Sequence, residues 1–166
     1  AVTCAVGVYT GNSTIYGTGK DAVLAVKRMF ENIDTVYTDG SNVDARSKML
    51  HASFYAGCAF TKSEVGYVHA IAHSLGGEYN VRHGLANAVV LPMVLESYGE
   101  KIHKKLARLA VAAGLAEHDT PCDEAAGRFI QDNNDMKVRY GLGARISAIR
   151  DEDLHKLSPY ADQHAN

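Results

Sequence analysis

The sequence predicts an all-α fold, a helical bundle, on three observations. Apolar residues recur at helical spacing from about residue 20 onward. The later segments are short, rich in alanine and leucine, and separated by glycine, proline or Asp-Thr-Pro. No stretch resembles a βαβ unit, and with no internal repeat or long linker the 166 residues predict a single domain over 1–166.

Two amphipathic helices are expected in the first third of the chain. Asn42 follows the turn-forming cluster Asp39-Gly40-Ser41, so it is predicted to begin the second helix. The apolar positions that indicate the two helices are Val23, Val26 and Phe30, then Leu50, Phe54 and Cys58.

The remaining helices are shorter, and two positions mark their irregularities. Pro92 falls inside the helical pattern NAVVLPMVLESYG, where the loss of a backbone donor costs about 3 kcal/mol and predicts a kink. Gly141-Leu142-Gly143 is interpreted as a helix end. The helices themselves are predicted at about residues 64–75, 84–98, 99–113, 121–139 and 151–164.

Charge and cysteine content narrow the class of protein. Seventeen Lys and Arg face nineteen Asp and Glu with mixed signs, which gives no indication of nucleic acid or an acidic membrane as a partner. No apolar run approaches the roughly 20 residues of a membrane span, so a soluble protein is expected.

Three widely spaced cysteines without a CxxC favour a reducing, cytoplasmic location. Because Ala1 opens directly on an apolar segment without a cap, we expect a truncated end.

The histidines are the main candidates for chemistry. His69 and His73 are four residues apart and share one face of a helix, as two ligands of one metal would. His83 joins them only if Gly76-Gly77 reverses the chain, since a straight helix would separate His69 from His83 by about 21 Å. Surface or satisfied core histidines remain the alternative. Solvent-exposed roles are expected for Glu64, Glu78, His51, His103, His118, His155 and His164.

A competing pattern lies near the start of the chain. Gly17-Thr18-Gly19-Lys20-Asp21-Ala22 matches GxGxxA, and Asp39 follows about 20 residues later, as in a dinucleotide-binding fingerprint. The fingerprint needs a buried strand before it, but only Ile15-Tyr16 separates it from a polar turn. An ordinary glycine-rich loop before a helix is the alternative interpretation.

Residues 66–92, GYVHAIAHSLGGEYNVRHGLANAVVLP, closely resemble the signature of the iron-containing (group III) alcohol dehydrogenases. That signature runs HxxxHxLG and then, after a short gap, HGxxNAxxLP. The segments DGSNVDARSKMLHASFYAGCAF and DEDLHKLSPYADQHAN are also similar to the family. The resemblance implies the family's dehydroquinate synthase-like C-terminal helical domain, truncated at both ends and without the N-terminal α/β domain that binds NAD or NADP.

The resemblance also implies roles for individual residues. His69 and His83 match the metal-binding histidines, whereas His73 matches a histidine that faces the nicotinamide and substrate and is therefore the catalytic candidate. Phe60 lies where the family packs an aromatic side chain beside the cofactor, although core packing explains it equally well.

The family's other two metal ligands lie in a DAxTHAxEAY segment, which AVTCAVGVY resembles with departures. Cys4 stands at the histidine of that pattern and Gly7 at the glutamate, so half of the site is altered. A Cys4 thiolate is able to bind iron or zinc, and an ordinary buried cysteine is the alternative.

The implied function is a metal-dependent oxidoreductase that interconverts a primary alcohol and its aldehyde, using Fe²⁺ or Zn²⁺ and hydride transfer to NAD or NADP. The isolated chain is expected to bind metal weakly and to be inactive, and the full-length protein is expected to form a homo-oligomer. A stand-alone helical metal-binding or interaction domain without redox activity is the alternative.

Overall fold

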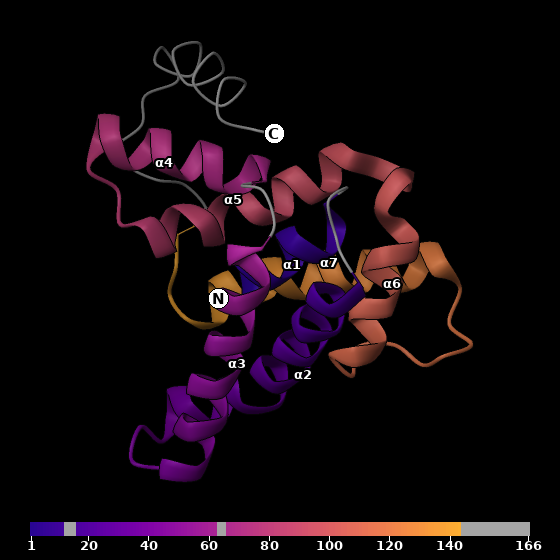
Figure 1. Ribbon diagram of the computed structural model, residues 1–166, viewed down its shortest axis with the longest axis horizontal. Helices are drawn as coiled ribbons and strands as arrows, with labels where there is room; N and C mark the ends of the chain where they lie inside the picture. Colours follow the sequence, from indigo (N-terminus) through magenta and orange to yellow (C-terminus); the bar gives the residue numbers. More distant parts are fainter. Residues whose placement is uncertain (12–15, 63–65, 144–166) are drawn as a thin grey trace. The chain divides into compact units, whose positions relative to one another are not determined.

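The computed structural model describes residues 1–11, 16–62 and 66–143, and every regular element in these ranges is a helix (Figure 1). The all-α prediction is therefore confirmed, while the helix expected at 151–164 lies outside the described residues. By their internal contacts the residues form two compact units, Ala1–Glu64 with Glu100–Phe129, and Val65–Gly99 with Ile130–Asn166. The helices are α1 (Val2–Thr10), α2 (Tyr16–Thr38), α3 (Val43–Thr61), α4 (Tyr67–Tyr79), α5 (His83–Tyr98), the 3₁₀ turn η1 (Gly99–Ile102), α6 (His103–Ala112) and α7 (Cys122–Arg139).

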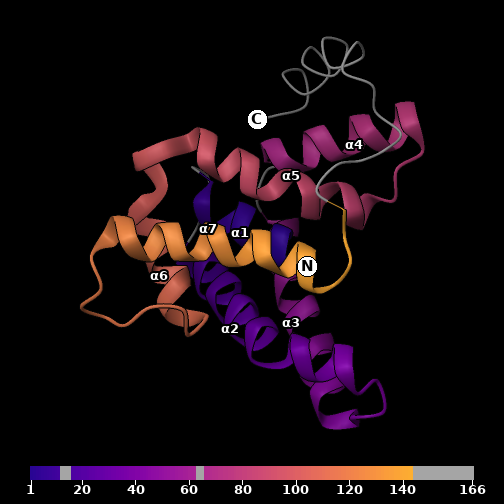
Figure 2. The same cartoon turned by 180° about the vertical axis from the view of Figure 1, so that it is seen from behind.

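Helix α1 lies at the centre of the first unit. It contacts α2, α3 and α6, and its near-continuous apolar sequence buries residues around the helix, as a core helix requires (Figures 1 and 2). Lys105 of α6 donates from Nζ to the carbonyl oxygens of Thr10 (3.1 Å) and Gly11 (2.8 Å), so a cation stabilises the C-terminal end of α1. This helix was not predicted from the sequence.

Helix α3 begins where the sequence predicted. The side chain of Asn42 accepts a hydrogen bond from the backbone of Ala45 at 3.0 Å. Before it, the Asp39 carboxylate accepts bonds from the backbone and hydroxyl of Ser41, and these bonds lower the pKa of Asp39. The start of the helix is thus set by local hydrogen bonds that the sequence encodes directly.

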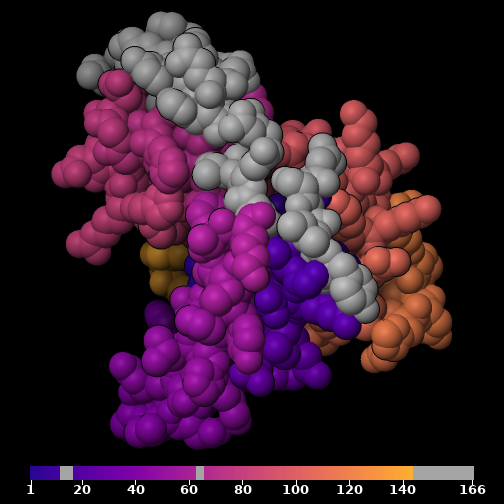
Figure 3. All heavy atoms as spheres, viewed as in Figure 1, coloured from indigo at the N-terminus to yellow at the C-terminus, as the bar shows by residue number. Residues whose placement is uncertain are grey.

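The predicted core face of α3 is wrong. Leu50 and Phe54 are 71% and 67% exposed, and Cys58 is half-buried. Alanines form the buried face and let α3 pack closely on α2. Side chains of α3 are visible on the face of the molecule that Figure 3 shows. The buried alanines are Ala45, Ala52, Ala56 and Ala59.

The first unit is closed by α2, η1, α6 and the beginning of α7. The rings of Phe30 in α2 and Phe129 in α7 stack with their centroids 5.7 Å apart, and Phe129 is fully buried. His103 was predicted to lie on the solvated surface. It is instead half-buried, and its Nδ1 lies 2.7 Å from the Asp123 carboxylate across 20 residues of sequence.

The second unit is built on α4 and α5, which lie side by side and are joined by only three residues (Figures 1 and 2). Pro92 lies inside α5 and is buried. At the end of α7, Gly141 adopts a positive φ of 68° and the Leu142 amide donates to the Lys137 carbonyl at 2.7 Å, which confirms the predicted helix end.

The glycine-rich pattern near the start does not form the loop of a dinucleotide fingerprint. Gly17 and Gly19 lie in the first turn of α2, and the described segment before them is helix α1 instead of a strand. The all-helical surroundings argue against the competing interpretation. Across the described ranges, no helix combines the length and hydrophobicity that a membrane crossing needs.

Candidate metal centre

The turn between α4 and α5 brings the signature histidines together within the second unit. Helix α4 continues through Gly76 and Gly77, so the predicted break at these glycines is wrong. The chain turns instead at Asn80, whose φ of 52° and ψ of 34° are left-handed. Its amide donates to the Gly76 carbonyl at 3.1 Å. Helix α5 then begins at His83 itself.

The three imidazoles form one cluster. Ring centroids are 5.8 Å apart for His69 and His83, 5.1 Å for His73 and His83, and 6.5 Å for His69 and His73. His69 is only 3% exposed, whereas His73 and His83 are exposed. The expected convergence of the three histidines is present, with one ring in the interior and two at the surface.

The ring separations favour the two pairs that include His83 and do not choose between His69 and His73 as its partner. Two imidazoles bound to one tetrahedral ion, each through a nitrogen about 2.1 Å away, hold their centroids roughly 5.3 Å apart. Both pairs that include His83 come close to this separation. The His69–His73 pair, which helical spacing alone favours, is the widest of the three. The geometry therefore makes His83 the common partner of the cluster.

Burial and mutual proximity favour the neutral form of His69 and of His83. Desolvation lowers the pKa of His69 to about 4, with further lowering by the charges that His83 and His73 would carry. The pKa of His83 is lowered by desolvation and then by His73. Neutral imidazoles have a free lone pair, which is the state that metal coordination needs.

Asn87, the asparagine of the HGxxNAxxLP pattern, also contacts the cluster, although no role was predicted for it from the sequence. Its side-chain Nδ2 lies 3.0 Å from Nε2 of His83 and donates to the His83 carbonyl oxygen at 3.0 Å. Asn87 is 5% exposed, and its Oδ1 is buried without a hydrogen-bond partner. Its position four residues after His83 on a helix is the sequence signal that would have identified it.

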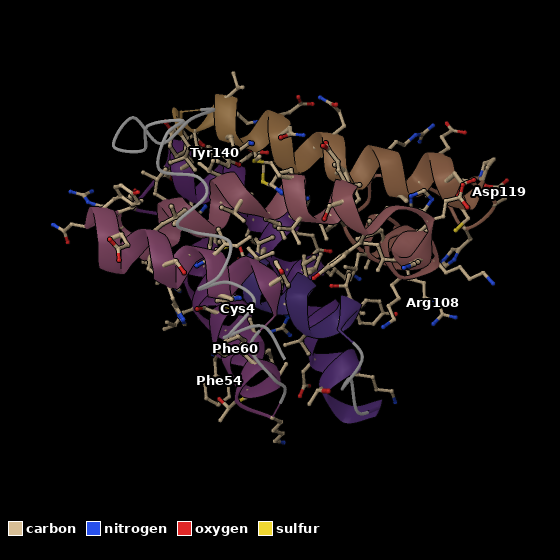
Figure 4. All side chains as sticks on the ribbon, turned by 90° about the horizontal axis from the view of Figure 1, so that it is seen from above. Cys4, Phe54, Phe60, Arg108, Asp119 and Tyr140 are labelled. Carbon is tan, nitrogen blue, oxygen red and sulfur yellow. The ribbon has the colours of Figure 1, made fainter. Side chains whose placement is uncertain are left out.

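The other predicted site residues lie in the first unit. Cys4 is on α1 and Phe60 is on α3, and both are half-buried (Figure 4). Cys4, Cys58 and Cys122 are all described and form no disulfide. Glu64 lies outside the described residues, while Glu78 is exposed as expected. Within the described ranges, no three His, Cys, Asp or Glu side chains meet the spacing of a complete metal site.

Comparison with known proteins places this geometry in a family. The sequence pattern of the Fe-containing alcohol dehydrogenase family, C-terminal, matches residues 5–165. Alcohol dehydrogenase 4 of Saccharomyces cerevisiae is 36% identical over 97% of this chain, and the NAD-dependent methanol dehydrogenase of Bacillus methanolicus is 27% identical over 97%.

Solved structures agree with the sequence comparison. A 1,3-propanediol oxidoreductase superposes with a TM-score of 0.93 at 30% identity over 99% of this chain. The chain spans 42% of the yeast protein, 43% of the methanol dehydrogenase and 44% of the oxidoreductase. It therefore corresponds to less than half of the length of these relatives.

Proposed function

We propose that this chain, which belongs to the Fe-containing alcohol dehydrogenase family and corresponds to its C-terminal helical domain, carries the metal-binding histidines of an enzyme that interconverts a primary alcohol and its aldehyde. His69 and His83 hold a divalent iron or zinc ion, and His73 faces the cofactor and the substrate. The convergence of these three rings in a family member is the observation that supports the proposal.

A divalent ion held by His69 and His83 would supply the Lewis acid for the alcohol oxygen, and NAD or NADP would supply the hydride acceptor. The NAD part of the proposal is supported by the name of the methanol dehydrogenase relative. Phe60 provides an apolar surface for the cofactor.

The histidines divide the remaining work according to their burial. His69 is held in the interior as a neutral imidazole, which favours a fixed ligand that water does not displace. His73 is exposed, and this accessibility suits a side chain that orients the substrate hydroxyl and passes its proton to solvent.

Metal affinity of the isolated chain is expected to be low. Two neutral imidazoles bring no negative charge to balance a divalent ion, and no third candidate ligand joins them among the described residues of the second unit. Turnover is expected only in a longer protein that contains this chain together with a nucleotide-binding domain.

An alcohol-oxidation assay tests the proposal. A longer protein containing this chain is expected to reduce NAD or NADP with a primary alcohol only after iron or zinc is supplied, and to lose this activity in His69→Ala and His83→Ala. The exposed His51 gives the matched control, since His51→Ala is expected to retain turnover. Metal binding without turnover in that longer protein would support a non-redox metal-binding domain instead.

A further inference from the structure

The side-chain amide of Asn87 contacts His83 at two points through one nitrogen, and these two contacts fix the orientation of the amide. Nδ2 of Asn87 lies 3.0 Å from both the His83 carbonyl oxygen and the His83 Nε2. If the amide were rotated to exchange its oxygen and nitrogen, two carbonyl oxygens would face each other at that distance. The carbonyl contact therefore requires the NH₂ group at this position, and its second hydrogen is available to Nε2.

A nitrogen that receives a hydrogen bond from an NH₂ group must present its lone pair. In the neutral imidazole of His83 the proton then resides on Nδ1. We propose that Asn87 is a positioning residue that selects the Nδ1-protonated tautomer of His83 and keeps Nε2 unprotonated. The same hydrogen bond occupies the Nε2 lone pair, so a metal ion that binds this nitrogen has to displace the Asn87 amide; only this consequence rests on the proposed function.

The buried oxygen of Asn87 supports a role at a ligand site. Oδ1 has no hydrogen-bond partner although its side chain is 5% exposed, and such an unsatisfied acceptor is unfavourable in a merely structural residue. Asn32 in α2 provides the contrast. It is also a buried asparagine that donates from Nδ2 to the carbonyl four residues earlier, that of Arg28, at 2.8 Å, but among the described residues no histidine ring is hydrogen-bonded to its amide.

Nitrogen-15 NMR of the metal-free chain tests the tautomer at about pH 8, above the ordinary histidine pKa of about 6.5. We expect His83 to carry its proton on Nδ1 in the wild type. Asn87→Asp replaces the donor by an acceptor, so we expect the proton to move to Nε2. Asn32→Asp, the matched control, is expected to leave the His83 signals unchanged. An Nε2-protonated His83 in the wild type, or one tautomer in all three proteins, would overturn the proposal.

A second variant covers the case in which Asn87→Asp does not fold. Asn87→Ala removes the donor without adding charge and is expected to raise the population of the Nε2-protonated form. An unchanged tautomer in folded Asn87→Ala would equally overturn the proposal. Because these measurements need no metal, cofactor or turnover, a failure of the proposed function leaves their result interpretable.

Discussion

His69 has the most unusual environment among the signature histidines. Its ring is buried, while His73, one helical turn later, is exposed. The sequence placed both histidines on one face of a helix but gave no measure of their depth. Depth depends on the partner helix, and α5 covers α4 only because the chain turns at Asn80. The roles assigned to these residues therefore came from family resemblance, and spacing alone favoured the wider pair.

The burial of His69 predicts a pH-dependent stability in the metal-free chain. Its folded-state pKa is about 4, below the ordinary value of 6.5, so the unfolded chain binds the proton more tightly. The stabilising contribution is fully present above pH 6.5 and is lost as the pH falls toward 4, by about 3 kcal/mol in total. Urea unfolding across this range measures the loss.

A neutral substitute separates this effect from general acid denaturation. His69→Gln is expected to flatten the fall in the free energy of unfolding between pH 6.5 and 4, whereas His51→Gln, in an exposed position, keeps it. Equal acid sensitivity in His69→Gln and the wild type would show that His69 is not the responsible group.

At the scale of single elements, α3 shows why a helix is easier to predict than its buried face. The large apolar residues Leu50 and Phe54 indicated the helix correctly but lie on its exposed side. Close packing on α2 uses small side chains, which carry little weight in a pattern of hydrophobicity. The periodicity identified the element, while the packing partner determined its orientation.

This packing predicts a clear loss of stability for one substitution in α3 and almost no change for another. Ala56 is 1% exposed, so Ala56→Leu forces extra carbons into the packed interior beside α3 and is expected to lower the free energy of unfolding by about 1–3 kcal/mol. Leu50→Ala removes a side chain that is 71% exposed and is expected to change stability by less than about 0.5 kcal/mol. Thermal or urea unfolding of both variants checks the order, and a larger loss in Leu50→Ala would contradict the assigned face.

The turn at Asn80 gives a second prediction for an element. Its φ of 52° suits glycine or asparagine, so Asn80→Gly is expected to keep the free energy of unfolding within a few tenths of a kcal/mol. Asn80→Val places a β-branched residue in the left-handed region and is expected to cost about 1–2 kcal/mol. Chemical unfolding compares the two variants, and equal stabilities would exclude a left-handed Asn80.

At the scale of the whole chain, local signals predicted most of the helices. The helices between residues 64 and 139 correspond to observed ones, with ends shifted by a few residues. Helix α1 was missed because it has no capping side chain and is apolar around its circumference. The His103–Asp123 pair was missed because it joins α6 to α7 across 20 residues, a distance at which sequence spacing carries no information.

The central claim is that His69 and His83 are metal ligands and that His73 is not. Zn²⁺ titration by calorimetry of a longer protein that contains this chain, in which tighter binding is expected than in the isolated chain, tests it directly in four single variants. The account predicts that His69→Ala and His83→Ala each weaken binding by more than about tenfold, the loss that removing even an outer-sphere partner causes. His73→Ala and the control His51→Ala are expected to bind as the wild type does. Binding that is lost in His73→Ala but retained in His83→Ala would contradict the account.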